Sequence, residues 1–141
     1  MLPELKDCWL DHIAIAVDSI DKRIAIYEDL GIHFDAKRER VEEQKVITAF
    51  ASIGERSHLE LLESTDPLGP IGKFISTKGE GIHHLSFRVD DIRKKMDELI
   101  SKGYRLIYSE PKTGANDMWV NFIHPSSTGG VLIEISEVKK R

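Results

Sequence analysis

The hydrophobic pattern repeats along the chain. Residues 12–20 read HIAIAVDSI, and 72 positions later residues 84–92 read HLSFRVDDI. In each copy the first Asp is followed by apolar residues at i, i+4 and i+7, and the pattern closes on Gly31 or Gly103. Alternation predicts a strand and the wider spacing predicts an amphipathic helix, with an Asp at its N-cap and a Gly at its end. The chain therefore contains two copies of one strand–helix unit.

Short runs rich in β-branched and aromatic residues follow each predicted helix. These runs are residues 32–35, 46–53 and 58–62 in the first copy and 104–107, 119–123 and 131–135 in the second. Each copy is then βαβββ, in an α+β chain. We expect a first module at about 9–63, a linker at 64–80 with room for one short helix, and a second module at about 81–138. One module alone leaves a sheet face uncovered, so the two are expected to pair about a pseudo-twofold axis into a cupped eight-stranded sheet within a single domain, residues 1–141.

Two histidines and two carboxylates occupy matching places in the modules. His12 and His84 begin the repeated strands and share a face with small or polar residues, while the opposite, apolar face must pack on a helix. Glu60 and Glu134 each lie between apolar neighbours in the last strand of a module. These glutamates are 74 positions apart, and we place the two extra residues in the loop 113–118, where an even insertion preserves the facing. All four groups are expected on the concave face.

Converging imidazoles and carboxylates form a mixed N/O shell that suits a divalent ion such as Co, Mn, Ni, Fe or Zn. The alternative is structural: each His hydrogen-bonded at a strand end and each Glu at a half-solvated position. Repeated burial of costly polar groups at matched positions favours the metal site. His58 shares a face with Glu60 and is an alternative ligand.

Composition removes several other classes of function. The chain has 141 residues, 40% apolar and 31% charged, as expected for one globular domain. Its net charge of −4 supplies no positive field for nucleic acid or an anionic membrane. No membrane span or export signal is visible, so a cytoplasmic protein is expected. Cys8 is the only cysteine, which excludes an internal disulfide and a thiolate zinc cage.

The chain resembles the methylmalonyl-CoA epimerases of the vicinal oxygen chelate (glyoxalase and extradiol dioxygenase) superfamily along nearly its whole length. The matching blocks are DHIAIAV at 11–17, EQ at 43–44, LELL at 59–62, PIGKF at 70–74, GEGIHH at 79–84, EPK at 110–112, FIHP at 122–125 and GGVLIE at 129–134. The resemblance implies the vicinal oxygen chelate fold, a homodimer, and an ion, expected to be cobalt, held by His12, His84 and Glu134. Glu60 lies where the family has Gln or Glu as a further ligand.

The activity implied by the resemblance interconverts (2R)- and (2S)-methylmalonyl-CoA in propionate metabolism. The α-proton is removed to give a metal-chelated enolate, which is reprotonated on the opposite face. We assign Glu134 and Glu60 as the two acid/base groups. Thr48 stands where some members carry a glutamate proposed as a base, and threonine cannot take that part; Glu60 would supply the missing carboxylate. Lys112 and Gly114, in the loop 111–115, are the candidates for contact with the acyl-CoA.

Three other functions fit the same fold. A glyoxalase I uses a similar His/Glu set for an enediolate proton transfer, but is not expected to carry the GEG block at 79–81 followed by the two adjacent histidines. An extradiol dioxygenase needs Fe(II) with open positions, which Glu60 as a fourth ligand would crowd. A non-catalytic sequestering module would have an apolar cup, and four ionisable groups on its floor argue against it.

Overall fold

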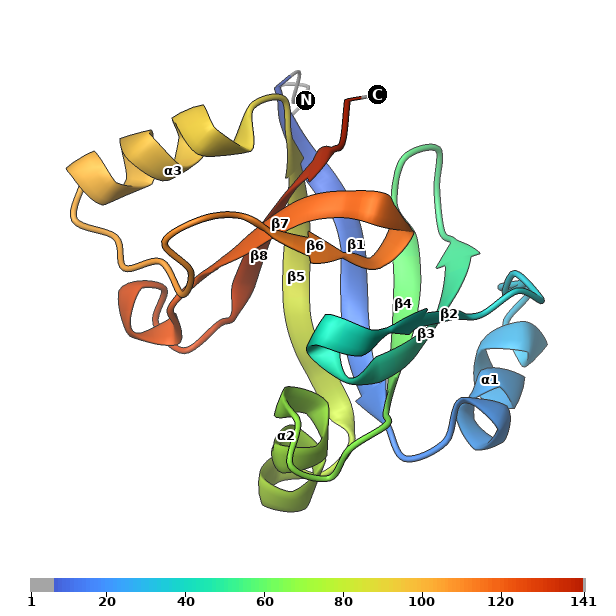
Figure 1. Ribbon diagram of the computed structural model, residues 1–141. Coiled ribbons are helices and arrows are strands. Elements are labelled where there is room, and N and C mark those ends of the chain that lie inside the picture. The colour runs from blue at the N-terminus through green and yellow to red at the C-terminus, as the bar shows by residue number, and fades with distance from the viewer. Residues whose placement is uncertain (1–6, 141) are drawn as a thin grey trace. The chain divides into compact units, whose positions relative to one another are not determined.

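The computed structural model describes residues 7–140, which form two compact units (Figure 1). One unit consists of residues 12–83, and the other combines residues 84–140 with residues 7–11. The strands are β1 (Cys8–Val17), β2 (Glu39–Val41), β3 (Val46–Ser52), β4 (His58–Ser64), β5 (Gly81–Val89), β6 (Lys112–Gly114), β7 (Met118–Ile123) and β8 (Ile133–Val138). The helices are α1 (Ile20–Asp29), α2 (Pro70–Lys78) and α3 (Ile92–Ser101), with 3-10 turns η1 (Glu42–Gln44), η2 (Ala115–Asp117) and η3 (Pro125–Ser127). The order β1-α1-β2-β3-β4 and then β5-α3-β6-β7-β8 confirms two βαβββ modules in an α+β chain.

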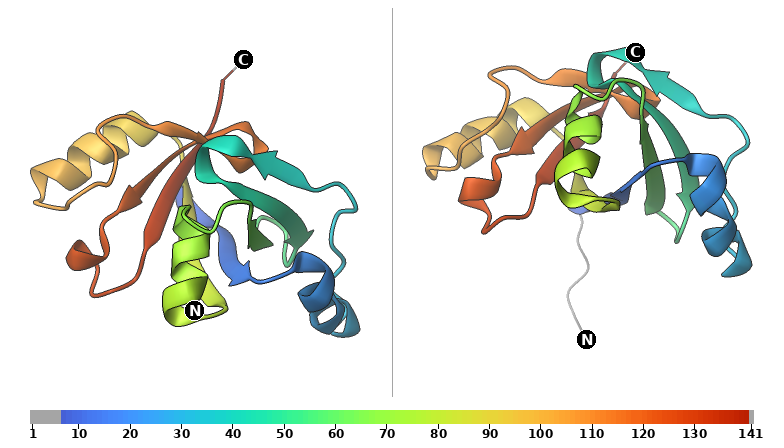
Figure 2. Two further views of the ribbon diagram at one scale, coloured as in Figure 1. Left: turned by 60° about the horizontal axis from the view of Figure 1, so that its bottom comes forward. Right: turned by 90° about the horizontal axis from the view of Figure 1, so that it is seen from below.

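In the unit of residues 12–83 the strand order is β2-β3-β4-β1. β1 runs parallel to β4, while the β2–β3 and β3–β4 pairs are antiparallel. Helix α1 packs on one face of these strands, as Figure 2 shows. The core between them is built on Val17, Ile20, Ala49 and Leu61. The apolar side chains of β1 therefore face the helix, as the alternation of apolar and small residues predicts.

The other unit repeats this plan with the order β5-β8-β7-β6. β5 is parallel to β8, and β6–β7 and β7–β8 are antiparallel. Helix α3 covers one face through a core of Val89, Ile92, Met96 and Ile135. We call the sheet face opposite the helix, which carries His12 in one unit and His84 in the other, the histidine face of that unit.

The helix ends show where local sequence decides structure. Gly31 and Gly103 follow α1 and α3 with φ of +92° and +89°, the left-handed conformation expected at a helix end. The prediction of an Asp at each N-cap is wrong for α1 and confirmed for α3. The N-cap residues are Ser19 in α1 and Asp91 in α3. Their side chains accept hydrogen bonds from the amides three residues on, at 3.4 and 3.0 Å. The Asp18 amide instead donates to Glu80.

The strands predicted at 32–35 and 104–107 are wrong. Each segment contributes only an isolated bridge, Phe34 to Ala51 and Leu106 to Ile123, and the edge strands are β2 and β6 farther along the chain. Phe34 and Leu106 pack against the two hydrophobic cores. Their apolar pattern therefore reports core packing rather than strand pairing.

The predicted position of the two extra residues is also wrong. Phe50 lies opposite Glu60 in the β3–β4 ladder, and Phe122 lies opposite Glu134 in the β7–β8 ladder. The phenylalanines are 72 positions apart and the glutamates 74, so the extra residues lie between β7 and β8, where η3 forms. The last strand accordingly begins at Ile133, not at residue 131. The register still sets Glu60 and Glu134 in equivalent places.

Helix α2 lies in the segment predicted as a linker and belongs to the unit of residues 12–83. It begins at Pro70, and a side chain at Gly72 would meet the Pro67 carbonyl oxygen at 2.6 Å. Only glycine fits there. Of the helices between residues 7 and 140, none has the length and apolar character needed to cross a membrane.

Candidate active site

His12 and Glu60 face each other on the histidine face of the unit of residues 12–83. His12 comes from β1 and Glu60 from the adjacent strand β4, where Glu60 lies beside Ala14. His12 Nε2 is 3.6 Å from Glu60 Oε1, and the two residues are only 7% and 3% exposed. The Phe50 ring meets the His12 ring edge-on, with centroids 6.1 Å apart. The small side chain of Ala14 leaves room above β1 for this pair.

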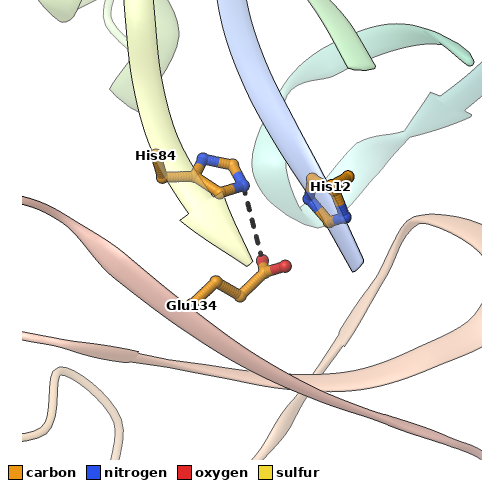
Figure 3. A group of neighbouring side chains, drawn as sticks. All are labelled: His12, His84 and Glu134. Atoms are coloured by element: carbon orange, nitrogen blue, oxygen red, sulfur yellow. Dashed lines mark ion pairs between the residues drawn. The ribbon is translucent and has the colours of Figure 1, made fainter. Parts of the chain in front are cut away.

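His84 and Glu134 form the matching pair in the other unit, drawn in Figure 3 with their ion pair dashed. They come from the parallel strands β5 and β8, where Glu134 lies beside Ser86. His84 Nε2 is 3.9 Å from Glu134 Oε2, with exposures of 5% and 4%. The Phe122 ring contacts the His84 ring edge-on at 5.4 Å between centroids. The same three groups, an imidazole, a carboxylate and a phenyl ring, therefore occupy equivalent strand positions in the two units.

The chemistry of these pairs fits a divalent metal ion. Ionised carboxylates buried this deeply are strongly disfavoured without a positive partner. Imidazole nitrogen with carboxylate oxygen is a donor set that suits Co, Mn, Ni, Fe or Zn. Two ligand atoms held about 2.1 Å from one ion lie roughly 3–4 Å apart. The distances of 3.6 and 3.9 Å within the two pairs fall in that range.

Thr48 and His58 lie on the same face as Glu60. Thr48 is fully buried in β3, and its hydroxyl donates to the Glu39 carbonyl oxygen at 3.4 Å. His58 lies beside His12 in the β1–β4 register, and its ring is 6.4 Å from that of Phe50. A hydroxyl bonded to backbone cannot act as a general base at neutral pH. Glu60 is therefore the carboxylate of this face that is placed next to a histidine.

Lys112 and Gly114 lie in the edge strand β6, where they pair with Val120 and Met118 of β7. Lys112 is exposed, with Nζ 5.9 Å from the centre of the Tyr108 ring. The Tyr108 ring lies 6.2 Å from Phe122, the ring that contacts His84. Gly114 is buried. A line of contacts therefore leads from the Lys112 ammonium group to His84.

Sequence reasoning missed Phe50 and Phe122 as parts of the site. Both lie in runs predicted as strands, and their spacing of 72 is the spacing of the repeat. Applying the repeat to every strand, rather than to the histidines and glutamates alone, would have found them.

His83, the neighbour of His84, contacts the Phe74 ring of α2, with the ring centroids 4.9 Å apart. Burial, with help from the charge of Lys78, lowers the pKa of His83 to about 4.

Comparisons with known proteins agree on one family. The model of the Glyoxalase/Bleomycin resistance protein/Dioxygenase superfamily matches residues 11–122. The chain is 40% identical to the "Uncharacterized protein YqjC" of Bacillus subtilis over 131 residues, 92% of each chain. It is 34% identical to the mitochondrial methylmalonyl-CoA epimerase of Dictyostelium discoideum over 130 residues, 91% of this chain and 77% of that one.

A solved structure agrees over the same span. A variant of Streptomyces coelicolor methylmalonyl-CoA epimerase, in complex with 2-nitronate-propionyl-CoA, superposes with a TM-score of 0.85 at 33% identity. The match covers 93% of this chain and 97% of that chain. These findings confirm the resemblance and the vicinal oxygen chelate fold. The chain therefore belongs to the glyoxalase/bleomycin resistance protein/dioxygenase superfamily and, within it, to the methylmalonyl-CoA epimerase family.

Proposed function

We propose that this protein is a metal-dependent epimerase that interconverts (2R)- and (2S)-methylmalonyl-CoA. The observation that carries the proposal is the repeated, buried His–Glu pair, His12 with Glu60 and His84 with Glu134. Epimerisation needs an acid and a base on opposite faces of one carbon atom. A chain that carries the same carboxylate in each of its two modules can supply both.

We assign His12, His84 and Glu134, the residues drawn in Figure 3, as ligands of one divalent ion. Their support is the donor chemistry, the burial and the matched places in the two modules. Glu60 is the candidate for a fourth ligand. When bound, the ion supplies a Lewis acid that stabilises negative charge developing on the thioester oxygen, a contribution of several kcal/mol. Cobalt stays our expected ion.

The two glutamates move the proton. An ionised carboxylate takes the proton from C2 of the substrate, and the C–H electron pair delocalises onto the thioester carbonyl. The second, protonated carboxyl group then delivers a proton to the other face of C2. We assign Glu134 and Glu60 to these roles, and each reverses its role in the opposite direction of the reaction. The phenyl rings of Phe50 and Phe122 keep the histidine faces apolar beside them.

The acyl-CoA would be held by the edge strand β6. The exposed Lys112 ammonium group suits a phosphate or carboxylate oxygen, and its contacts with Tyr108 lead toward His84. The Streptomyces relative binds a CoA thioester analogue, which supports an acyl-CoA as the substrate class. The homodimer and the cytoplasmic location stay predictions.

The test is direct conversion of a single stereoisomer. Cobalt-loaded protein is incubated with (2R)-methylmalonyl-CoA, and the product is analysed for the 2S form; parallel samples receive a glyoxalase hemithioacetal or a catechol. We expect inversion of methylmalonyl-CoA and no turnover of the other two substrates. Turnover of the hemithioacetal alone would replace the epimerase with a glyoxalase. Failure of the protein to bind metal would favour a sequestering module.

A further inference from the structure

Lys139, just beyond the end of β8, is tied to the segment between β6 and β7 by three contacts. Its Nζ donates to Thr113 Oγ1 at 2.6 Å and lies 3.3 Å from Asp117 Oδ1. The same ammonium group lies over the Trp119 ring, 4.2 Å from its centre. The Lys139 side chain is 19% exposed, so these contacts are largely shielded from water. We call Lys139, Thr113, Asp117 and Trp119 the lysine latch.

The segment that the latch holds has an unusual backbone. Asn116 and Asp117 are consecutive non-glycine residues with φ of +57° and +55°. Left-handed conformations are unfavourable for such residues and persist only where surrounding contacts enforce them. The ion pair of Lys139 with Asp117 is one such contact.

The equivalent bend in the other module is held differently. Lys45 lies 72 positions before Asp117 and has the same φ of +55°. Its carbonyl oxygen accepts a hydrogen bond at 3.0 Å from the amide of Thr65. Thr65 lies 74 positions before Lys139, so it is the repeat counterpart of Lys139. One module thus fixes its bend with a backbone bond from this position, and the other module has a charged side chain there.

The alternation of side chains along β6 links the latch to Lys112. Thr113 pairs with Trp119, a residue packed against the helix-side core of its unit. The side chain of the neighbouring Lys112 therefore points the other way, toward the histidine face, and Gly114 occupies a position of the same facing. Fixing Thr113 by its hydroxyl holds β6 against rotation and register slip. The latch thus fixes which way the Lys112 side chain projects.

We propose that Lys139 is a positioning residue for acyl-CoA binding: it holds β6 so that Lys112 and Gly114 meet the CoA portion of the ligand. This inference rests on the proposed function in one respect, that the ligand is an acyl-CoA. Lys139 contacts Thr113, Asp117 and Trp119, none of which we assign to metal binding or to proton transfer. It should therefore affect binding of CoA and leave the proton transfer unchanged.

The test compares Lys139→Met with Lys139→Arg and with Lys140→Met, a change at the exposed neighbouring lysine. Methionine keeps an apolar stem for Trp119 but has neither the hydrogen-bond donor nor the positive charge of lysine. Arginine keeps the donor and the charge. We measure the Kd of CoA by calorimetry, KM and kcat for methylmalonyl-CoA, and amide hydrogen exchange of residues 112–117. Lys139→Met should raise Kd and KM about five- to tenfold, with kcat within about twofold of wild type, as for loss of one charge-assisted hydrogen bond.

Amide exchange of residues 112–117 should quicken in Lys139→Met, recover in Lys139→Arg and be unchanged in Lys140→Met. Unchanged exchange, or faster exchange without weaker CoA binding, would overturn the proposal. A kcat loss equal to the KM effect would also overturn it, since that marks general damage to the site. If wild type binds CoA but does not turn over methylmalonyl-CoA, the proposed function fails, while weaker CoA binding by Lys139→Met still supports the latch. A wild type that binds no CoA defeats both.

Discussion

Nε2 of His12 lies 3.6 Å from Oε1 of Glu60, across the parallel strands β1 and β4. This pair has the same place in its module as His84 and Glu134 have in theirs, and it carries a carboxylate where relatives of the resembled family have Gln or Glu. Under the proposed function Glu60 is an acid/base group as well as a candidate ligand.

Changing Glu60 to Gln should remove the proton transfer while keeping the shape of the side chain. We expect kcat for epimerisation to fall by at least about 100-fold, because an amide cannot exchange a proton with the substrate at neutral pH. Bound metal, measured by atomic emission, should stay near the wild-type amount. Glu55→Gln, an exposed change in the β3–β4 turn, is the control and should be fully active. Full activity of Glu60→Gln with metal bound would refute the acid/base role.

Metal binding should depend on His84 and much less on His58. His84→Ala removes a proposed ligand whose Nε2 faces Glu134, so cobalt affinity should fall by at least about 100-fold. Because an ion that binds only the folded state stabilises it, cobalt should raise the melting temperature of wild type and of His58→Ala but not of His84→Ala. If His58→Ala loses the metal and His84→Ala keeps it, His58 replaces His84 as ligand.

Two glutamates should stabilise the helix starts equally. The Ile20 amide of α1 donates to Glu63 Oε1 at 2.8 Å, and the Ile92 amide of α3 donates to Glu137 Oε1 at 2.9 Å. A carboxylate at a helix N-terminus offsets the exposed amides and the helix dipole. Glu63→Gln and Glu137→Gln should each lower the free energy of unfolding by about 1 kcal/mol in urea titrations. Exposed Glu28→Gln is the control; a loss at only one site would show that the repeat does not extend to this bond.

Acid should destabilise the fold through His83. Its pKa is about 4 in the folded protein because it is buried, against 6.5 for the free group. Between these values the unfolded chain binds more protons, so stability falls as the pH drops from about 6.5 toward 4, by about 3 kcal/mol in total. His83→Gln should flatten this slope in urea titrations run with a chelator, whereas His33→Gln, at an exposed position, should not. A slope that His83→Gln leaves intact would assign the acid sensitivity to other groups.

Much of the fold follows from local pattern. The repeat of HIAIAV and HLSFRV predicted both modules, and Gly31 and Gly103 do end their helices in the left-handed conformation. The edge strands were misplaced because Phe34 and Leu106 are apolar for the core, not for a ladder. The two-residue insertion was misplaced because the spacings of 72 and 74 between equivalent residues give the size of the insertion but do not say which loop contains it.

The sequence predicted where the site residues lie on the strands, but not what they do. Alternation placed His12, Glu60, His84 and Glu134 correctly on faces opposite the helices, and the structure buries all four. Their roles as ligands and acid/base groups stay predictions. The lysine latch could not be read from the sequence, because Lys139 and Thr113 are 26 positions apart and only the β6–β7–β8 register brings them together.

Exchange of the substrate α-proton with solvent tests the proposed proton transfer most directly. In deuterated water, the NMR signal of the α-proton of (2R)-methylmalonyl-CoA is followed with cobalt-loaded wild type, chelated wild type and Glu134→Ala. We expect rapid loss of the signal only with cobalt-loaded wild type, accompanied by formation of the 2S isomer. Persistence of the signal with metal-loaded wild type, or loss at the wild-type rate with Glu134→Ala, would contradict proton transfer at the paired His–Glu site.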